Sequence, residues 1–265
     1  AYEDSSKIEE TEITDFMADK WKGYIKANKE VLENEINTKV SKSNLESIAK
    51  TVSSLPKDKK FLRKIERLID DRKSMFFERD KIDWAMGEML AHGSILMEGY
   101  NVRNSGQDVE RGTFSHRHAI LKSEESEEEV VLLDNIESEA RGTFKAYNSL
   151  LSEYGVLGFD YGYAMASPKT LTIGEAQFGD FSNGAQIVID QYISAAEDKW
   201  KLQNGIVLFL PHGYEGQGAE HSSARMERFL QLCGDDNMIM ANCTSPSNLF
   251  HLLRRQLLAN YRKPL

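Results

Sequence analysis

The sequence predicts an α/β fold with a mostly parallel sheet sandwiched by helices, preceded by an α-helical N-terminal arm. Residues 1–80 contain one glycine and one proline, whereas the other 17 glycines and four prolines lie beyond residue 80. From residue 81, apolar segments of helical length alternate with shorter strand-like ones, which is typical of a parallel sheet covered by helices. We therefore expect a helical arm over residues 1–80 and an α/β domain over residues 81–265.

The arm is predicted to be helical because its apolar residues recur at helical spacing between charged ones of both signs. Pro56 separates two of the predicted helices, since proline lacks a backbone donor and disfavours helix just before it. The mixed charges do not indicate a recognition helix for an acidic or basic partner. The apolar groups are Phe16, Trp21 and Tyr24, then Leu45, Ile48, Val52 and Leu55, then Phe61, Ile65, Leu68 and Ile69.

The domain is predicted from apolar segments bounded by turn formers. Ser245 precedes the last helix as a candidate N-cap. The acidic residues 124–129 are interpreted as a solvated loop, because five carboxylates in six residues repel one another. The segments 119–121 and 130–133 flank the acidic run. In chain order, the expected elements are a helix over 82–99, a strand over 100–103, a helix over 155–166, a strand over 170–173, a helix over 184–200, a strand over 206–210, a helix over 224–232, a strand over 238–240 and a helix over 247–261.

Composition excludes several classes of function. The net charge of −9 argues against a nucleic-acid-binding surface. No apolar run reaches the ~18 residues of a transmembrane helix, so no membrane partner is expected. Cys233 and Cys243 are too few for a disulfide framework and indicate reduced thiols in a cytoplasmic setting. His116 and His118 suggest a zinc pair, but no third ligand has suitable spacing, so we predict no metal site.

A functional site is expected at the ends of the predicted strands. The strand 206–210 leads into the glycine- and histidine-rich segment 211–223, and ligands of α/β proteins bind at the carboxyl ends of parallel strands. Glu153 stands at a helix start, where the alternative is a carboxylate that favours the helix dipole. Glu175, Gln177 and Asp180 follow another strand, where the alternative is an ordinary loop of turn-forming residues.

Four motifs carry a resemblance to a known family. In this order, they resemble the thiamine-dependent E1 component of the 2-oxoglutarate dehydrogenase complex, over about residues 81–265; the first 80 residues resemble the family's helical linker only loosely. The motifs are Arg111-Gly-Thr-Phe-Ser-His-Arg-His-Ala119, Leu150-Leu-Ser-Glu-Tyr-Gly155, Thr172-Ile-Gly-Glu-Ala-Gln-Phe-Gly-Asp-Phe-Ser-Asn-Gly-Ala-Gln186 and the segment from Pro211 to Phe229.

The resemblance implies that this sequence is a fragment of a longer chain, corresponding to the pyrimidine-binding, transketolase-like domain. The Gly-Asp-Gly…Asn signature that holds magnesium and the diphosphate in this family is absent, and the nearest string begins at Gly234. The resemblance thus implies thiamine diphosphate as cofactor, with magnesium ligands in a missing diphosphate-binding domain.

The motif positions imply roles for individual residues. Glu153 matches the catalytic glutamate that bonds the aminopyrimidine ring nitrogen and promotes the imino tautomer. Gln177 and Phe181 match residues that line the pyrimidine pocket, and Leu151 matches an apolar residue beside the ring. His221 matches a catalytic histidine that faces the 2-oxo acid.

Two positions qualify this match. His212 is a weaker candidate that orders its loop. Many members of the family carry tryptophan where this chain has Gly174, which affects packing beside the Gln177 loop.

The resemblance also implies a reaction and partners. The full-length enzyme is expected to decarboxylate 2-oxoglutarate oxidatively and to transfer the succinyl group to the lipoyl group of its E2 partner. It is expected to be a homodimer, in the cytoplasm or, in a eukaryote, the mitochondrial matrix, and the fragment alone is expected to be inactive. The alternatives are a non-catalytic assembly module of the same complex, or a different thiamine enzyme such as a transketolase or another 2-oxo acid dehydrogenase.

Overall fold

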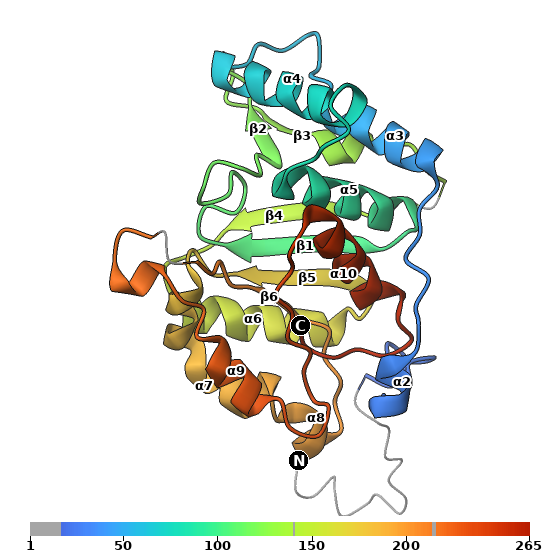
Figure 1. Ribbon diagram of the computed structural model, residues 1–265, viewed down its shortest axis with the longest axis vertical. Coiled ribbons are helices and arrows are strands. Elements are labelled where there is room, and N and C mark those ends of the chain that lie inside the picture. Colours follow the sequence, from blue (N-terminus) through green and yellow to red (C-terminus); the bar gives the residue numbers. More distant parts are fainter. Residues whose placement is uncertain (1–16, 140, 214–215) are drawn as a thin grey trace, which may run out of the picture.

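The fold is built on a four-stranded parallel sheet, as predicted (Figure 1). The computed structural model describes residues 17–139, 141–213 and 216–265. All three strand pairings are parallel, so the carboxyl ends of the strands share one edge, on the left in Figure 1. In sheet order the strands are β4 (Phe144–Asn148), β1 (Asn101–Gly106), β5 (Thr170–Glu175) and β6 (Val207–Phe209).

Helices cover both faces of the sheet because side chains alternate along each strand. Val102, Leu171 and Val207 point to one face, where they share a core with α5 (Trp84–Met97) and α10 (Pro246–Leu258). α5 is apolar around most of its circumference and almost wholly buried, as expected of a central helix. The Ser245 hydroxyl accepts a hydrogen bond from Asn248 N at 3.2 Å, which confirms the predicted cap of α10.

The opposite face of the sheet is covered by α6 (Glu153–Ala166). Arg103 and Ser105 of β1 both donate hydrogen bonds to Asp160 of α6. A Cβ at Gly174 would lie 3.3 Å from Leu157 Cδ1 and 3.4 Å from Asp160 Oδ2. Glycine therefore lets α6 pack closely on β5, and a tryptophan at this position would need more space than this chain leaves.

The N-terminal arm packs directly on the domain. It contains α2 (Lys29–Glu33), α3 (Lys42–Val52) and α4 (Arg63–Phe77), of which α3 lies beside α5 (Figure 1). A Cβ at Gly93 of α5 would come within 2.4 Å of Ile48 Cγ2, so this glycine permits the close approach of the two helices. The burial of the apolar side of α3 against α5 explains how a highly charged helix is stabilised.

The prediction of a helix around Trp21 and Tyr24 is wrong. Residues 17–23 form turns, and Gly23 has a φ of +93°, which is outside the helical region. Trp21 Nε1 instead donates a hydrogen bond to the Met165 carbonyl at 3.0 Å, and the Tyr24 hydroxyl donates to the Pro168 carbonyl at 3.3 Å. These bonds tie the segment to the end of α6. Phe16 lies outside the described residues.

The predicted strand over residues 238–240 is also wrong. Residues 263–265 lie beside β6, where Leu265 N donates to the Ile206 carbonyl (3.0 Å) and Leu208 N donates to the Leu265 carbonyl (2.7 Å). Ile239 N donates to the Pro264 carbonyl at 2.8 Å. Residues 238–240 therefore bond to the segment 263–265 and not to a strand of the sheet, so they do not form a strand themselves.

The predicted helix over residues 184–200 is interrupted. Ser194 N donates to the Ile189 carbonyl, a five-residue step typical of a π-turn. The Ser194 carbonyl accepts a hydrogen bond from Asn237 Nδ2 at 2.7 Å. The partner of this carbonyl is therefore a side chain and not a backbone amide of the helix. The segment consists of η2 (Gly179–Ala185), α7 (Gln186–Val188), η3 (Ile189–Ile193) and α8 (Ala196–Trp200).

Of the remaining elements, the helices α5, α6 and α10 lie where they were predicted, whereas the strand β4 was not predicted from the sequence. β2 (Ile120–Lys122) and β3 (Glu129–Val131) form an antiparallel pair around the acidic run, whose residues 124–129 are exposed. Two short 3₁₀ turns, η1 (Leu132–Asn135) and η4 (Ala219–His221), and the helix α9 (Met226–Leu232) complete the fold. Among the described residues, no helix is both long and apolar enough to cross a lipid bilayer.

Candidate functional site

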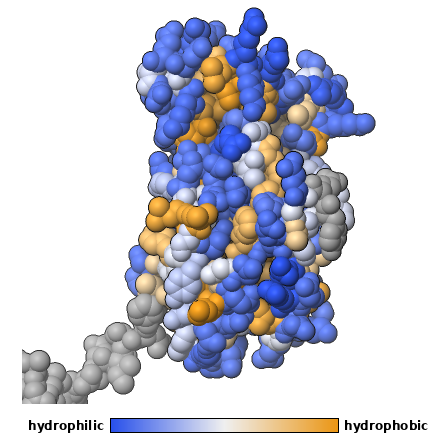
Figure 2. Space-filling model, turned by 90° about the vertical axis from the view of Figure 1, so that its left-hand side faces the viewer, coloured by the Kyte–Doolittle hydropathy of each residue, from blue (hydrophilic) through white to orange (hydrophobic). Residues whose placement is uncertain are grey.

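The loops at the carboxyl edge of the sheet enclose two cavities. The larger has a volume of about 820 Å³, and Phe178, His212 and His221 contribute to its lining. The smaller, of about 20 Å³, is lined by Glu153 and Gly174 among others. Figure 2 views the molecule from this side and shows apolar surface, in orange, in patches between hydrophilic areas. The cavities lie where ligands of parallel α/β proteins bind.

Glu153 is the first residue of α6 and faces the smaller cavity. The capping role falls to its neighbour, because the Ser152 hydroxyl accepts a hydrogen bond from Gly155 N at 3.3 Å. Burial raises the pKa of Glu153 to about 7, since desolvation penalises the charged carboxylate. Near neutral pH this carboxyl is therefore about half protonated, and in its protonated form it can donate a hydrogen bond.

His221 lies among aromatic rings from the loop after β5. Its ring centroid is 4.5 Å from that of Phe178 and 5.4 Å from that of Phe181, both in edge-on arrangements. Its Nδ1 lies 3.3 Å from Glu220 Oε1, and its side chain is 29% exposed. The imidazole is therefore packed on two sides and still open to the larger cavity.

The structure brings some of the predicted residues together and leaves others apart. Phe181 of the turn η2 contacts His221. Gly184 of the same turn lies close to Glu153, because a Cβ built at Gly184 would be 3.6 Å from Glu153 Cβ. The turn η2 thus connects the two predicted catalytic residues. Gln177 is half-buried in the loop before this turn. Leu151 is 79% exposed and lines neither cavity.

His212 holds the backbone of its own loop, as the sequence suggested. Its Nδ1 accepts a hydrogen bond from Ala224 N at 3.1 Å. It also contributes to the wall of the larger cavity.

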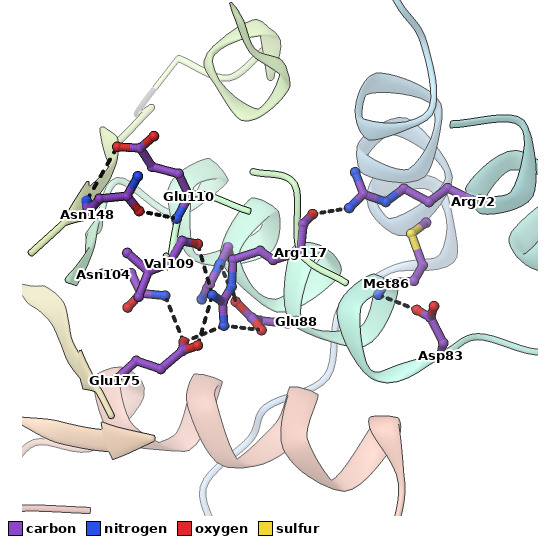
Figure 3. Close-up of polar contacts among 11 residues, drawn as sticks. Arg72, Asp83, Met86, Glu88, Asn104, Val109, Glu110, Arg117, Asn148 and Glu175 are labelled. Atoms are coloured by element: carbon purple, nitrogen blue, oxygen red, sulfur yellow. Dashed lines mark hydrogen bonds and ion pairs between the residues drawn. The ribbon is translucent and has the colours of Figure 1, made fainter. Parts of the chain in front are cut away.

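A buried ion cluster at the same edge was not predicted (Figure 3). Arg117 lies between Glu88 of α5 and Glu175 at the end of β5, with Nε–Oε1 2.7 Å to Glu88 and Nη2–Oε2 2.5 Å to Glu175. Asn104 Nδ2 donates to Glu175 Oε2 at 3.4 Å, and Arg117 donates to the Val109 carbonyl at 2.9 Å. Glu175 lines both cavities, so the cluster forms part of the wall between them.

The two carboxyls of the cluster differ in proton affinity. Burial raises the pKa of Glu175 above its usual range and outweighs the opposing effect of Arg117. Burial acts in the same direction on Glu88, but the charge and hydrogen bonds of Arg117 lower its pKa below the usual range. Burial also lowers the pKa of the neighbouring His92 to about 4, so this ring is neutral.

The interpretation of Glu175 as part of an ordinary loop is wrong, because β5 extends to this residue and buries it. A signal was available in the sequence. Glu88 is the one acidic residue within the apolar run of α5, and a buried charge requires a partner.

His116 and His118 flank Arg117 in the sequence and lie beside this cluster. His116 is half-buried beside Phe114, with ring centroids 5.9 Å apart. Burial and the charge of Arg72 lower the pKa of His118 to about 4. No group of three His, Cys, Asp or Glu side chains within residues 17–139, 141–213 and 216–265 is arranged to hold a metal ion.

The fold and the site define a class. A parallel sheet covered by helices, with two cavities at the carboxyl edge of its strands, is an α/β domain of the kind that binds ligands at that edge. Residues 80–265 match the family described as "Transketolase, pyrimidine binding domain", and the chain belongs to this family.

The chain is also similar to curated proteins named "2-oxoglutarate dehydrogenase E1 component". Those of Brucella canis, Brucella suis and Brucella anthropi are each 48% identical to it over 251 residues. The match covers 95% of this chain and 25% of each relative. The chain therefore spans about a quarter of the length of these proteins.

Proposed function

We propose that this chain is the aminopyrimidine-binding part of a thiamine diphosphate-dependent 2-oxoglutarate dehydrogenase E1 component. The observation that carries the proposal is Glu153, a carboxyl with a pKa raised to about 7 at the edge of a small cavity. The family and the similarity to E1 components support it. The full-length enzyme would decarboxylate 2-oxoglutarate and transfer the succinyl group to a lipoyl group of E2.

The residues present fit the pyrimidine half of the cofactor. A protonated Glu153 can donate to a ring nitrogen, and the Phe181 ring offers an apolar face for stacking. By motif position, Gln177 and the exposed Leu151, which line neither cavity in this structure, would also contact the ring once it is bound. When bound, thiamine diphosphate supplies an electron sink for the decarboxylation. The diphosphate and magnesium would be held elsewhere in the full-length protein, since the described residues bring no three metal-binding side chains together.

In the reaction, this chain would contribute proton control and charge stabilisation. Glu153 would exchange a proton with the ring nitrogen, as its near-neutral pKa allows at physiological pH. His221 would donate a hydrogen bond to the substrate carboxylate or to the oxygen on which negative charge develops. Phe178 and Phe181 hold the imidazole at the cavity from two sides.

We also propose a homodimeric parent enzyme. Several large apolar side chains of α6 and α7 are exposed, more than isolated surface residues would account for. They are Phe159 (60%), Tyr163 (37%) and Ile187 (62%), with Leu150 (82%) and Leu151 (79%) just before α6. The two cysteines are free thiols, which supports a reducing compartment such as the cytoplasm or the mitochondrial matrix.

The test uses full-length enzyme that contains this chain. Glu153→Gln preserves shape and removes the titrating proton, so we expect loss of 2-oxoglutarate decarboxylation with the fold intact. Glu227→Gln, at an exposed position on α9, is the matched control and should retain wild-type turnover. Near-normal turnover by Glu153→Gln would return this residue to a helix-start role and favour a non-catalytic assembly module.

A further inference from the structure

Asp180 joins the loop after β5 to the loop that carries His221. Its side chain is 2% exposed, and its Oδ2 accepts hydrogen bonds from Ser222 N at 2.9 Å and Ser223 N at 2.8 Å. Its Oδ1 lies 3.2 Å from Arg225 Nη2. The two serines follow His221 directly in the sequence, so the bonds fix the backbone where this histidine leaves the turn η4.

The same two loops are held together at other points. Gly179 N donates to the Pro211 carbonyl at 2.9 Å, and a Cβ at Gly179 would lie only 2.6 Å from the Cβ of Ala224. Within the His221 loop itself, Gly213 N donates to the Ser222 carbonyl at 2.9 Å. The backbone of the His221 loop therefore lies directly against the segment that contains Asp180.

The hydrogen bonds that Asp180 accepts are stronger than hydrogen bonds between neutral groups. A buried carboxylate is costly unless hydrogen bonds and a counter-charge compensate it, and hydrogen bonds to charged groups contribute more than neutral ones. Asp180 has two backbone donors and the Arg225 guanidinium. Its neighbour Phe181 contacts the His221 ring, so the same short segment sets both the backbone and the ring of this histidine.

We infer that Asp180 is a positioning residue that fixes His221 against Phe178 and Phe181, with its imidazole open to the larger cavity. The catalytic importance of His221 in this inference rests on the proposed function. The position of the loop that carries His221 does not depend on that function. Asp180 itself lines neither of the two cavities, so it acts through His221.

The first experiment measures amide hydrogen exchange in the full-length enzyme. In Asp180→Ala, we expect the peptide that covers Ser222 and Ser223 to exchange about tenfold faster, because its two amides lose a charged acceptor. Asp190→Ala is the matched control, since this carboxylate accepts a hydrogen bond of 2.8 Å from Gln186 Nε2 and lies outside both cavities. Unchanged exchange in the Asp180 variant would overturn the inference.

The second experiment measures turnover with a double-mutant cycle. We expect Asp180→Ala to lower kcat roughly 10–100-fold, the cost of a displaced catalytic group. In the His221→Ala background, the same substitution should have no further effect on kcat, because Asp180 acts through His221. If the effects of the two substitutions on kcat multiply in the double variant, the inference is overturned. Asp180→Asn retains an acceptor oxygen, so its kcat and its exchange rate should lie between those of the wild type and of Asp180→Ala. If the alanine variant does not fold, Asp180→Asn serves for the same measurements.

The two experiments separate this inference from the proposed function. If His221→Ala alone retains wild-type turnover, the catalytic role of His221 is refuted, whatever the exchange experiment shows. If His221→Ala loses turnover but the exchange of Ser222 and Ser223 is insensitive to Asp180, the positioning inference alone is refuted.

Discussion

Arg117 and Glu88 form an ion pair in which both side chains are almost completely excluded from solvent, with Nε–Oε1 2.7 Å. Glu175 contacts the same guanidinium from the other side, so two carboxyls depend on one cation. Together the three side chains join α5 to the carboxyl end of β5. An electrostatic cluster is therefore built into the wall of the predicted site.

The first prediction concerns this cluster. Arg117→Met leaves two buried carboxyls without their counter-charge, so we expect a loss of about 3–5 kcal/mol in the free energy of unfolding. The measurement is chemical denaturation of the full-length protein. Arg111→Met is the matched control, because the ion pair of Arg111 with Asp108 is largely exposed and worth at most about 1 kcal/mol. Equal midpoints for the two variants would contradict the prediction.

The second prediction is a pH dependence that arises from Glu153. Its pKa is raised from 4.5 to about 7 in the folded state, so the folded protein binds more protons than the unfolded one between these values. This contribution to stability therefore falls as pH rises from about 4.5 to about 7 and stays low above it. Thermal midpoints should show Glu153→Gln gaining on the wild type between pH 5 and pH 8. A constant difference over this range would speak against the raised pKa.

The third prediction separates the two histidines of the site. His221→Ala in the full-length enzyme should reduce 2-oxoglutarate turnover by about 10²–10³-fold, as expected for the loss of a donor to developing charge. His212→Ala should reduce turnover less, because its described hydrogen bond is to the backbone of Ala224. Cofactor affinity should change little in either variant. Lower thermal stability with preserved turnover in His221→Ala would show a purely structural role.

The fourth prediction tests two glycines with opposite outcomes. Gly106 ends β1 with a φ of +155°, and a Cβ there would lie 2.1 Å from the Glu175 carbonyl oxygen. Gly106→Ala should therefore be strongly destabilising. Gly162 lies within α6 with nothing within 4 Å of its Cβ position, so Gly162→Ala should stabilise by about 0.5–1 kcal/mol. Thermal unfolding of both variants checks the signs.

The fifth prediction concerns residues 1–265 alone. This chain should not decarboxylate 2-oxoglutarate, because the phosphates and magnesium would lack their ligands, which contribute much of such a cofactor's affinity. Isothermal calorimetry with thiamine diphosphate, with and without magnesium, is the measurement. Tight binding that depends on magnesium would contradict it.

Much of the fold could be predicted because periodicity directly reflects burial. The strand at 170–173 and the helix at 155–166 were recognisable from apolar spacing and bounding turn formers. The segment 238–240 could not be assigned correctly, because its partner is the distant Pro264 and not an adjacent strand. Likewise, the break in the predicted helix 184–200 depends on Asn237, which is far away in the sequence.

The predicted site residues were located by motif, but their environments were not accessible from the sequence. The raised pKa of Glu153 results from burial that only the packed loops create. The role of Arg117 required Glu88 and Glu175, two residues on separate elements, to meet around it. Local patterns identify which residues carry chemistry, whereas the partners of those residues are set by tertiary contacts.

The bond from Ser222 to Asp180 spans 42 residues, and this has a consequence for the order of folding. Closing a segment of that length costs chain entropy, which the pairing of β5 with β6 must offset first. Both strands lead directly into the two loops that the bond connects. The sheet should therefore form before the site, and His221 would reach its place among the last steps of folding.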